Sequence, residues 1–442
     1  MKKTTLLLLL FLFINYSFAQ QTIGYQWAKK LTPGGIKSGK CLTVDSNGNV
    51  YVFQGDTGSN NDYNNYLQKY DKNGTVLWSK LITAKASYFD FNGIVVDANE
   101  NVFITVSLAG TINFTPNTPV FNGSWTTNIA KFDKDGNYLW AKNIVTRLSH
   151  QPSIKKLGID GVGNLYITGE FLGIVDFDPG SGTANVGVVD KISSFFAKYD
   201  NNGNYIYAKK IGEFVNNSSN AFYTKDLFLD NKGNIYVCGQ FVGTHDFDPG
   251  LGIVNLSSVS TTSKDLFFAK YDSEGNYLWV KSIGMPTDSG VMHSLAVDKN
   301  GNVYITGNFE GTVDFDSGPV IVNLTKINTA TDKYRGYLVK YDANGNYVWV
   351  KNIGGSSLSL DNLGNIYLIG QYYKTTDFDL GEGTAILPAS SGSDFSKFFA
   401  KYDDNGNYKW AKKVDFNSND VVSGVNGDIY LTGYFFGDLD FD

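Results

Sequence analysis

Two short phrases alternate along this chain, and their repetition limits the folds that it can adopt. The first phrase reads Asp-x-x-Gly-Asn-(Val/Ile/Leu)-Tyr, with copies that begin at Asp45, Asp97, Asp160, Asp230, Asp298 and Asp361 and a last copy at 426–433. The second phrase reads Tyr-Asp-x-x-Gly-Asn-Tyr-x-Trp-x-Lys, with copies that begin at Tyr70, Phe132, Tyr199, Tyr271, Tyr341 and Tyr402. Such self-similarity indicates a repeat architecture, in which each repeat is one supersecondary unit.

Each phrase predicts a β-hairpin. Asp at the first turn position and Gly at the fourth fit a type I turn that a left-handed glycine closes. The flanking residues alternate with the two-residue period of strands. A unit therefore has four strands, which we place in the fifth unit at 294–298, 302–309, 337–342 and 346–353. If Tyr271 lies opposite Tyr277, counting along the strands places Ala269 opposite Trp279, a small residue beside a large core ring.

The spacing of the units predicts an all-β fold, a β-propeller of four-stranded antiparallel blades. Successive aspartates of the first phrase are separated by 52, 63, 70, 68 and 63 residues. Fixed-period four-stranded units are the signature of propellers, and 48 Gly, 28 Tyr and 31 Phe suit short strands and tight turns. Seven first hairpins, six second hairpins and an isolated fourth strand around Trp27 favour seven blades.

The two ends of the chain carry separate expectations. Lys2 and Lys3, the apolar run 6–14 and the small residues before a cleavage point after Ala19 predict a signal peptide over 1–19. The propeller then occupies 20–442, and no stretch predicts a membrane span. Residues 25–31 would complete the last blade, whose third strand is missing. We therefore expect a C-terminally truncated chain, whose natural form continues for about 20–25 residues beyond Asp442.

Charge and cysteine content exclude some functions. Without the signal peptide the chain has 35 basic and 43 acidic side chains, a mildly acidic balance that argues against nucleic-acid binding. Cys41 and Cys238 fall in units three apart by the repeat register. A disulfide needs Cα atoms within about 7 Å, so we expect two separate thiols. Cys238 stands where other units carry threonine and is interpreted as a small packing residue.

The repeats resemble a known family. The first hairpin is similar to the NHL repeat, and the full unit, with GTVDFD and then FFAKYD and GNYLWAK segments, looks like the bacterial SBBP β-propeller repeat over about 20–442. The resemblance implies an exported or surface-attached bacterial protein, and the signal peptide and Asn/Tyr/Lys-rich style look like those of Bacteroidetes. Some NHL-like propellers are metal-dependent lyases, but this chain lacks a matching histidine set.

A third phrase, Asp-Phe-Asp before a turn signal, lies between the second and third strands of several units. It occupies 176–180, 246–250, 314–318 and 377–381, and the chain ends within another copy at 440–442. The second unit has 113–116 (NFTP) instead. We expect a small extra hairpin, in which the phenylalanine packs onto its blade and the second aspartate caps the turn.

The alternative role of these carboxylates is Ca²⁺ binding. Two aspartates on one strand face supply oxygens that hard cations need, although the spacing is not that of an EF-hand loop. The candidate ligands are Asp176, Asp178, Asp246, Asp248, Asp314, Asp316, Asp377 and Asp379. No other cofactor is expected.

The sequence predicts a secreted or cell-surface, non-catalytic propeller. The three histidines, His150, His245 and His293, have no metal-ligand spacing, and no nucleophile or phosphate-loop motif occurs. Long insertions such as 257–264 and 328–335 would present a surface to a protein or a glycan. The alternatives are a propeller lyase or hydrolase with an axial site, to which His293 comes nearest, or a Ca²⁺-binding structural propeller.

Overall fold

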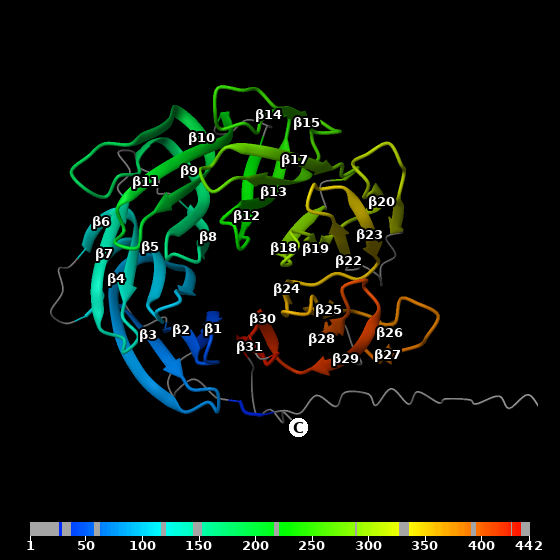
Figure 1. Cartoon of the computed structure of the whole chain (residues 1–442), viewed down its shortest axis with the longest axis horizontal. Helices are drawn as coiled ribbons and strands as arrows, with labels where there is room; N and C mark the ends of the chain where they lie inside the picture. The colour runs from blue at the N-terminus through cyan, green and yellow to red at the C-terminus, as the bar shows by residue number, and fades with distance from the viewer. Residues whose placement is uncertain are drawn as a thin grey trace, which may run out of the picture.

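All regular elements that the structure describes are β-strands. The computed structural model describes residues 26–28, 37–56, 62–115, 121–144, 153–215, 221–287, 290–326, 336–389, 395–425 and 427–434. The sheets follow one another around a common centre (Figure 1). This arrangement agrees with the predicted all-β, propeller-like fold. The predicted signal peptide at 1–19, His150, the insertion 328–335 and the last Asp-Phe-Asp copy at 440–442 lie outside the described residues.

The first two units share one seven-stranded antiparallel sheet. Its strands, in order, are β1 (Lys37–Val44), β2 (Val50–Asp56), β3 (Asp62–Tyr70), β4 (Val76–Val96), β5 (Val102–Asn113), β6 (Phe121–Phe132) and β7 (Tyr138–Ile144). β4 is both the fourth strand of unit one and the first strand of unit two. Residues 81–92 contain neither glycine nor proline, so nothing in this stretch interrupts the strand.

Units three to six are four-stranded antiparallel sheets. Unit three has β8 (Ser153–Ile159), β9 (Leu165–Asp176), β10 (Asn185–Tyr199) and β11 (Tyr205–Val215). Unit four has β12 (Ala221–Leu229), β13 (Ile235–Val242), β16 (Asp265–Tyr271) and β17 (Tyr277–Ile283). Unit five has β18 (Val291–Val297), β19 (Val303–Asn308), β22 (Gly336–Tyr341) and β23 (Tyr347–Lys351). Unit six has β24 (Ser357–Leu360), β25 (Ile366–Tyr372), β28 (Ser396–Tyr402) and β29 (Tyr408–Val414).

Three small hairpins project outward from units four to six, as predicted for the third phrase (Figure 1). They are β14 (Thr244–Asp246) with β15 (Asn255–Ser257), β20 (Gly311–Asp314) with β21 (Asn323–Lys326), and β26 (Thr376–Asp377) with β27 (Ile386–Leu387). In unit three the ends of β9 and β10 form the equivalent hairpin. The last described pair is β30 (Asn417–Ser423) with β31 (Ile429–Tyr434).

The repeated turns form as predicted, because the aspartate side chain supports them. In the turn at Asp298, Oδ1 accepts the backbone N–H groups of Asn300 and Asn302 at 2.9 and 3.0 Å. Gly301, at φ +86°, closes the turn and adopts this left-handed conformation without a steric penalty. Glu100 takes the same position at φ +63° and its N–H still donates to the Asp97 carbonyl at 2.9 Å, so the degenerate copy keeps the turn.

The predicted register of the second hairpin is wrong by one residue. Tyr271 does pair with Tyr277, but Lys270, not Ala269, lies opposite Trp279. The reason is a β-bulge between Lys270 and Tyr271, which follows from the left-handed glycine that closes this type of turn. The same bulge places Lys131 opposite Trp140, and the remaining copies repeat it.

The bulge places a lysine and a tryptophan opposite each other, and both can contact the next unit. In unit one, Trp78 Nε1 donates to the Lys134 carbonyl of unit two at 2.9 Å. In unit five, Lys340 Nζ donates to the Asp404 carbonyl of unit six at 3.0 Å. The turn glycine of unit two, Gly136, packs directly against the indole ring of Trp78, because a Cβ at this position would come within 2.9 Å of the ring. We call this set of contacts the inter-unit clamp.

Trp27 makes the same clamp with unit one, although residues 26–28 are not in a strand. Its Nε1 donates to the Lys72 carbonyl at 2.8 Å, and a Cβ on Gly74 would come within 2.6 Å of its ring. Trp27 also packs against Tyr430 of β31, with ring centroids 6.3 Å apart. Residues from the two ends of the described chain therefore lie side by side.

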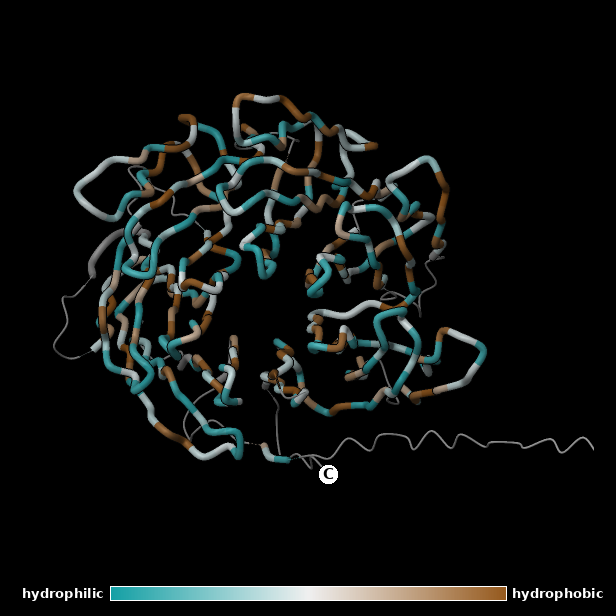
Figure 2. Tube along the Cα trace, in the orientation of Figure 1, coloured by the Kyte–Doolittle hydropathy of each residue, from teal (hydrophilic) through white to brown (hydrophobic). Residues whose placement is uncertain are grey.

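The first strands of successive units contact one another around the centre. These contacts run from β1 to β4, β8, β12, β18, β24 and β30, and return from β30 to β1. The apolar core lies between neighbouring sheets, where one cluster combines Tyr236 and Phe268 of unit four with Val303 and Tyr337 of unit five. Figure 2 shows the hydrophobic and hydrophilic residues that alternate along these strands.

The two cysteines are separate thiols, as predicted. Neither Cys41 nor Cys238 forms a disulfide. Cys238 is fully buried at the position that Thr168 and Thr306 occupy in units three and five. Burial raises the pKa of the Cys238 thiol well above its usual value, which keeps the thiol protonated and unreactive.

His245 predicts a pH dependence of stability. It replaces the buried Val175 and Val313 of the neighbouring units, is 4% exposed, and its Nε2 lies 2.7 Å from the Val242 carbonyl. Burial lowers the pKa of His245, so the unfolded chain binds a proton near pH 6.5 that the folded chain does not. Stability is therefore full above this pH and falls as the pH drops below it.

We expect His245→Val to flatten this dependence. When the pH is lowered from about 8 to about 5, the unfolding free energy of the parent protein should fall by up to about 1.4 kcal/mol per pH unit more than that of the variant. Thermal unfolding at a series of pH values measures this difference. His293 remains in both proteins and cancels in the difference. Parallel curves for the two proteins would contradict the prediction.

Candidate functional site

The Asp-Phe-Asp phrases form the bases of the outer hairpins. Phe177, Phe247, Phe315 and Phe378 are fully buried. The carbonyl of each accepts a hydrogen bond from a third-strand tyrosine, as in Tyr341 to Phe315 at 2.8 Å. Phe114 is also fully buried in unit two, where it packs near Phe132 and Tyr138. The predicted packing role of this phenylalanine is confirmed.

The carboxylates of the phrase bind backbone N–H groups of their own hairpin. Asp246 Oδ1 accepts the N–H groups of Asp248 and Val254 at 3.0 and 2.8 Å, and Asp248 Oδ1 accepts that of Gly250 at 2.8 Å. The pairs Asp176 and Asp178, Asp314 and Asp316, and Asp377 and Asp379 repeat these contacts. The turn-capping role is therefore confirmed.

Calcium binding by these residues stays a prediction. Among the described residues, no three His, Cys, Asp or Glu side chains gather in a way that could hold a metal ion. A cation at the Asp-Phe-Asp base would have to compete with the N–H groups that already occupy one oxygen of each carboxylate.

The histidines lie apart from one another. His245 is packed against Phe222 and Phe241 beneath the hairpin of unit four. His293 is the bulged residue of the first strand of unit five, between Met292 and Ser294. Burial, with a smaller effect of the Lys225 charge, lowers the pKa of His293 to about 4, so it is neutral at physiological pH.

A charged cluster at the axis went unnoticed in the sequence. Lys156 Nζ lies 3.6 Å from Asp226 Oδ1 of the next unit. The charges of Asp226 and then Asp420 raise the pKa of Lys156, which places all three groups within electrostatic reach across the ring. Asp226 accepts the Leu295 N–H at 3.1 Å, and Asp420 accepts the Ser357 hydroxyl at 3.2 Å.

These three residues occupy one register position of the repeat. Each follows the bulge in the first strand of its unit, namely units three, four and seven along the chain. Cys41 and Ser294 occupy the same position in units one and five. Aligning the first strands would have shown this ring of positions, but only the fold shows which of them come together.

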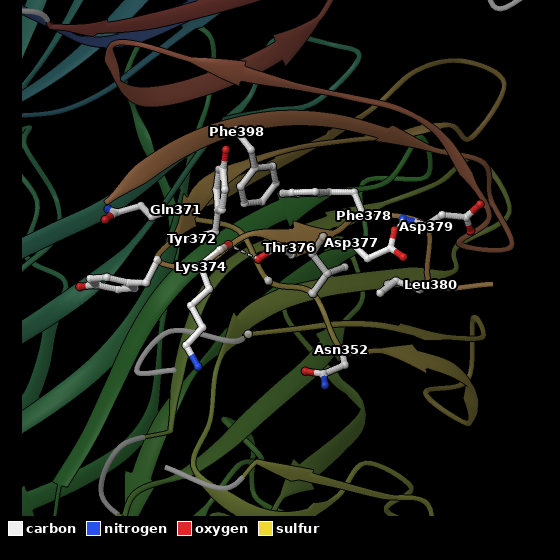
Figure 3. A pocket seen from close by; sticks show the side chains of 14 residues that line it. Asn352, Gln371, Tyr372, Lys374, Thr376, Asp377, Phe378, Asp379, Leu380 and Phe398 are labelled. Atoms are coloured by element: carbon white, nitrogen blue, oxygen red, sulfur yellow. Dashed lines mark hydrogen bonds between the residues drawn. The ribbon is translucent and has the colours of Figure 1, made fainter. Parts of the chain in front are cut away.

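A cavity lies between units five and six, and its lining includes Asp377 and Asp379, two of the carboxylates predicted as Ca²⁺ ligands. It has a volume of about 230 Å³ and is lined by Asn352 and Gly354 of unit five and by Gln371, Tyr372, Lys374, Thr376 and Phe398 of unit six, among others. Figure 3 shows Asn352 and Lys374 on one side of it and Phe398 on the opposite side. We call it the unit 5/6 cavity.

Two sequence signals mark this cavity. Lys374 and Thr376 stand where unit five has Gly311 and Val313. The distance from the end of the second phrase to the next aspartate is 10 positions between Lys351 and Asp361, against 17 between Lys281 and Asp298. The shorter connection lacks residues such as Met285, which fills the equivalent space between units four and five.

The chain is similar to known propeller repeats and propeller-containing proteins. The SBBP β-propeller repeat matches residues 278–308. The chain is 26% identical, over 92% of its length, to an uncharacterized WD repeat-containing protein of Acanthamoeba polyphaga mimivirus. It covers 36% of that relative and so spans about a third of its length. These matches support a β-propeller repeat protein.

Two solved structures show low similarity. A protein of unknown function from Bacteroides caccae has a TM-score of 0.35 at 11% identity, with 70% of this chain and 80% of that chain covered. The extracellular domain of a putative hybrid two-component system from B. thetaiotaomicron has a TM-score of 0.22 at 14% identity, with 89% and 55% covered. Within the described residues, no helix has the length and apolarity needed to cross a membrane.

Removing the axial ammonium should destabilise the fold. Lys156→Met leaves Asp226 and Asp420 without their cation, and Asp226 is only 7% exposed while Lys156 is 45% exposed. We expect a loss of about 2 kcal/mol in unfolding free energy at neutral pH, less than for a fully buried pair. The loss should shrink in acid, because burial raises the pKa of Asp420 and the protonated carboxyl needs no partner.

Lys85→Met is the matched control for this variant. Lys85 pairs with Asp62 at 3.9 Å, and both side chains are more than half exposed. Its replacement should change stability by less than about 0.5 kcal/mol. Equal effects of the two substitutions, measured by denaturant unfolding, would contradict a structural role for the axial cluster.

Titration calorimetry tests the calcium hypothesis. Because backbone N–H groups already occupy the Asp-Phe-Asp carboxylates, we expect no heat beyond dilution up to about 1 mM Ca²⁺, the range of weak extracellular modules. A saturable heat that Asp246→Asn and Asp314→Asn remove would instead establish cation sites at the hairpin bases.

Proposed function

We propose that this protein is an exported, non-catalytic β-propeller of seven blades that binds a protein or a glycan at the cell surface. The described strands make six four-stranded units and the pair β30–β31, whose first strands contact each other around the centre. The clamp that Trp27 makes with unit one supports its assignment to the fourth strand of the last blade. The signal peptide that the sequence predicts over 1–19 supports export.

The outer hairpins are the main support for this proposal, because they share a repeated base while the residues at their tips differ from unit to unit. Each base is an Asp-Phe-Asp phrase whose phenylalanine is buried and whose carboxylates bind backbone N–H groups, so the backbone of the hairpin is held in place. The tips carry apolar side chains that are largely exposed, with Leu251 and Ile253 in unit four and Val320 and Ile321 in unit five, and in unit six the exposed apolar residue is Ile386 of β27. Figure 2 shows hydrophobic stretches at the outer edge of the molecule. Gathered apolar residues on a rigid loop are typical of contact surfaces.

The alternative function is an axial enzyme of the lyase or hydrolase class. The observation in its favour is the cluster of Lys156, Asp226 and Asp420 at the axis, where propeller enzymes place catalytic groups. However, hydrogen bonds to the backbone and to serine hydroxyls hold both carboxylates, and His293 is a neutral imidazole beside Lys225. These contacts favour a structural role for the cluster. Turnover of a substrate that His293→Ala abolishes would favour the enzyme.

A glycan array and a pull-down of surface proteins test the binding function. We expect the parent protein to retain a specific glycan or protein, and the variant Leu251→Ser/Ile253→Ser/Val320→Ser/Ile321→Ser to lose at least a protein partner. The control is Val162→Ser/Leu363→Ser, since both residues are equally exposed but lie in first-hairpin turns. Substitutions at such exposed positions should change stability by less than about 0.5 kcal/mol. No retained partner in either assay would contradict the proposal.

A further inference from the structure

The unit 5/6 cavity exists because unit six lacks residues that fill the corresponding space elsewhere. Between units four and five, Met285 of the connection and Met292 of β18 are fully buried in the shared core. Between units three and four, Phe214 and Phe222 take this role. The connection into unit six is seven positions shorter, and β24 has four residues where β18 has seven. The core there contains Ile353 and Phe378 but no counterpart of the methionines.

Unit six also differs from its neighbours in the residues that border the cavity. The buried Val313 of unit five corresponds to Thr376, whose hydroxyl donates to the Lys374 carbonyl at 2.7 Å. The glycine at 311, with φ +76°, corresponds to Lys374. The unit with the shortened connection therefore has a threonine hydroxyl in place of an apolar valine and a lysine ammonium in place of a glycine.

The polar groups of the cavity include an amide oxygen without a partner. Asn352 Oδ1 is buried and accepts no hydrogen bond from the residues that the structure describes. The Gln371 side chain is exposed at the cavity, whereas the equivalent Gln240 donates to the Gly290 carbonyl at 2.6 Å. Amide groups both donate and accept hydrogen bonds, and a buried acceptor left unpaired is unfavourable. Because Asn352 Oδ1 is enclosed, the exposed Gln371 amide is the group that most readily accepts hydrogen bonds from, and donates them to, a ligand with hydroxyl groups.

Aromatic rings form the remaining wall and the mouth. Tyr372 and Phe398 are buried at the back of the cavity. Tyr373 also lines it, and its ring packs against Phe395 at 4.0 Å between centroids. Phe395 is 39% exposed, which leaves an apolar ring surface next to the polar groups. Aromatic faces beside amides suit the C–H face and hydroxyl groups of a sugar ring.

Size and charge narrow the ligand further. A cavity of about 230 Å³ is smaller than the roughly 300–1,000 Å³ that drug-sized ligands need, and accommodates a single ring. Lys374 is accompanied by two carboxylates, Asp377 and Asp379, so the site does not concentrate the positive charge that an anionic group would require. The lining therefore favours a neutral ligand.

We propose that the unit 5/6 cavity binds one neutral sugar residue of a glycan chain, an assignment that rests on the binding function proposed above. Asn352, Gln371 and Lys374 hydrogen-bond the hydroxyl groups. The Tyr373–Phe395 ring pair contacts the residue that follows in the glycan chain.

Saturation-transfer NMR on the full chain tests this assignment. The probes are soluble neutral oligosaccharides of glucose, galactose, mannose and xylose, with a polygalacturonate oligomer as the anionic comparison. We expect saturation transfer to at least one neutral oligosaccharide. The variant Lys374→Gly/Thr376→Val, which restores the residues of unit five, should bind at least tenfold more weakly with an unchanged melting temperature.

Two further variants complete the test. Asn352→Ser introduces the residue that unit four has at the equivalent position, Ser282, and should weaken binding. This variant keeps the test available if the double variant misfolds. Thr312→Val removes an exposed hydroxyl of the unit five hairpin outside the cavity and should leave binding unchanged. Equal binding by all variants would overturn the cavity assignment while leaving glycan binding in place. Binding of the anionic oligomer alone would overturn the cavity assignment and leave the proposed function intact. The same conclusion would follow if no glycan bound while the hairpin tips still retained a protein.

Discussion

The inter-unit clamp is the contact on which the rest of this structure depends. A four-stranded sheet with two apolar faces cannot bury both of them alone, so each unit needs its neighbours. The clamp fixes how neighbours meet. In unit one the Trp78 ring covers the turn glycine of unit two and its N–H donates to a backbone carbonyl there, whereas in unit five the Lys340 ammonium makes this bond and Trp349 Nε1 has no partner among the described residues. Any residue with a Cβ at Gly136 would collide with Trp78. The glycine is therefore required for packing as well as for the turn.

The clamp also explains which parts of the chain are free to differ between units. It involves only the second hairpin and the unit that follows. The first-strand bulge, the outer hairpin and the connection between units carry no clamp residues. These are the places where the axial charges, the apolar tips and the unit 5/6 cavity occur. A repeated scaffold thus leaves three sets of positions at which individual units acquire their own chemistry.

The axial cluster shows how such positions become coupled. Lys156, Asp226 and Asp420 belong to units three, four and seven, and the ion pair of Lys156 with Asp226 joins two different first strands. Each carboxylate is hydrogen-bonded by an adjacent first strand, Asp226 from unit five and Asp420 from unit six. Together they link first strands across the ring, and the stability of the centre then depends on charges that hundreds of residues separate in sequence.

Local patterns in the sequence predicted the hairpins, the aspartate-supported turns and the buried phenylalanine of the Asp-Phe-Asp phrase. All of these are decided by a few neighbouring residues, because turn chemistry and strand period act over short distances. The bulge that pairs Lys270 with Trp279 was also implied by the left-handed glycine, but counting residues without the bulge led to the wrong pairing with Ala269.

The sequence by itself determined the class of fold, the repeated unit and the places where the chain turns. Only the tertiary structure decided that Lys156 meets Asp226 and Asp420, that Trp27 joins unit one to β31, and that a shortened connection leaves a cavity beside Asn352. The physical reason is that these features depend on how the sheets pack around the centre. A missing segment or a charge across the ring leaves no periodic signal in the residues next to it.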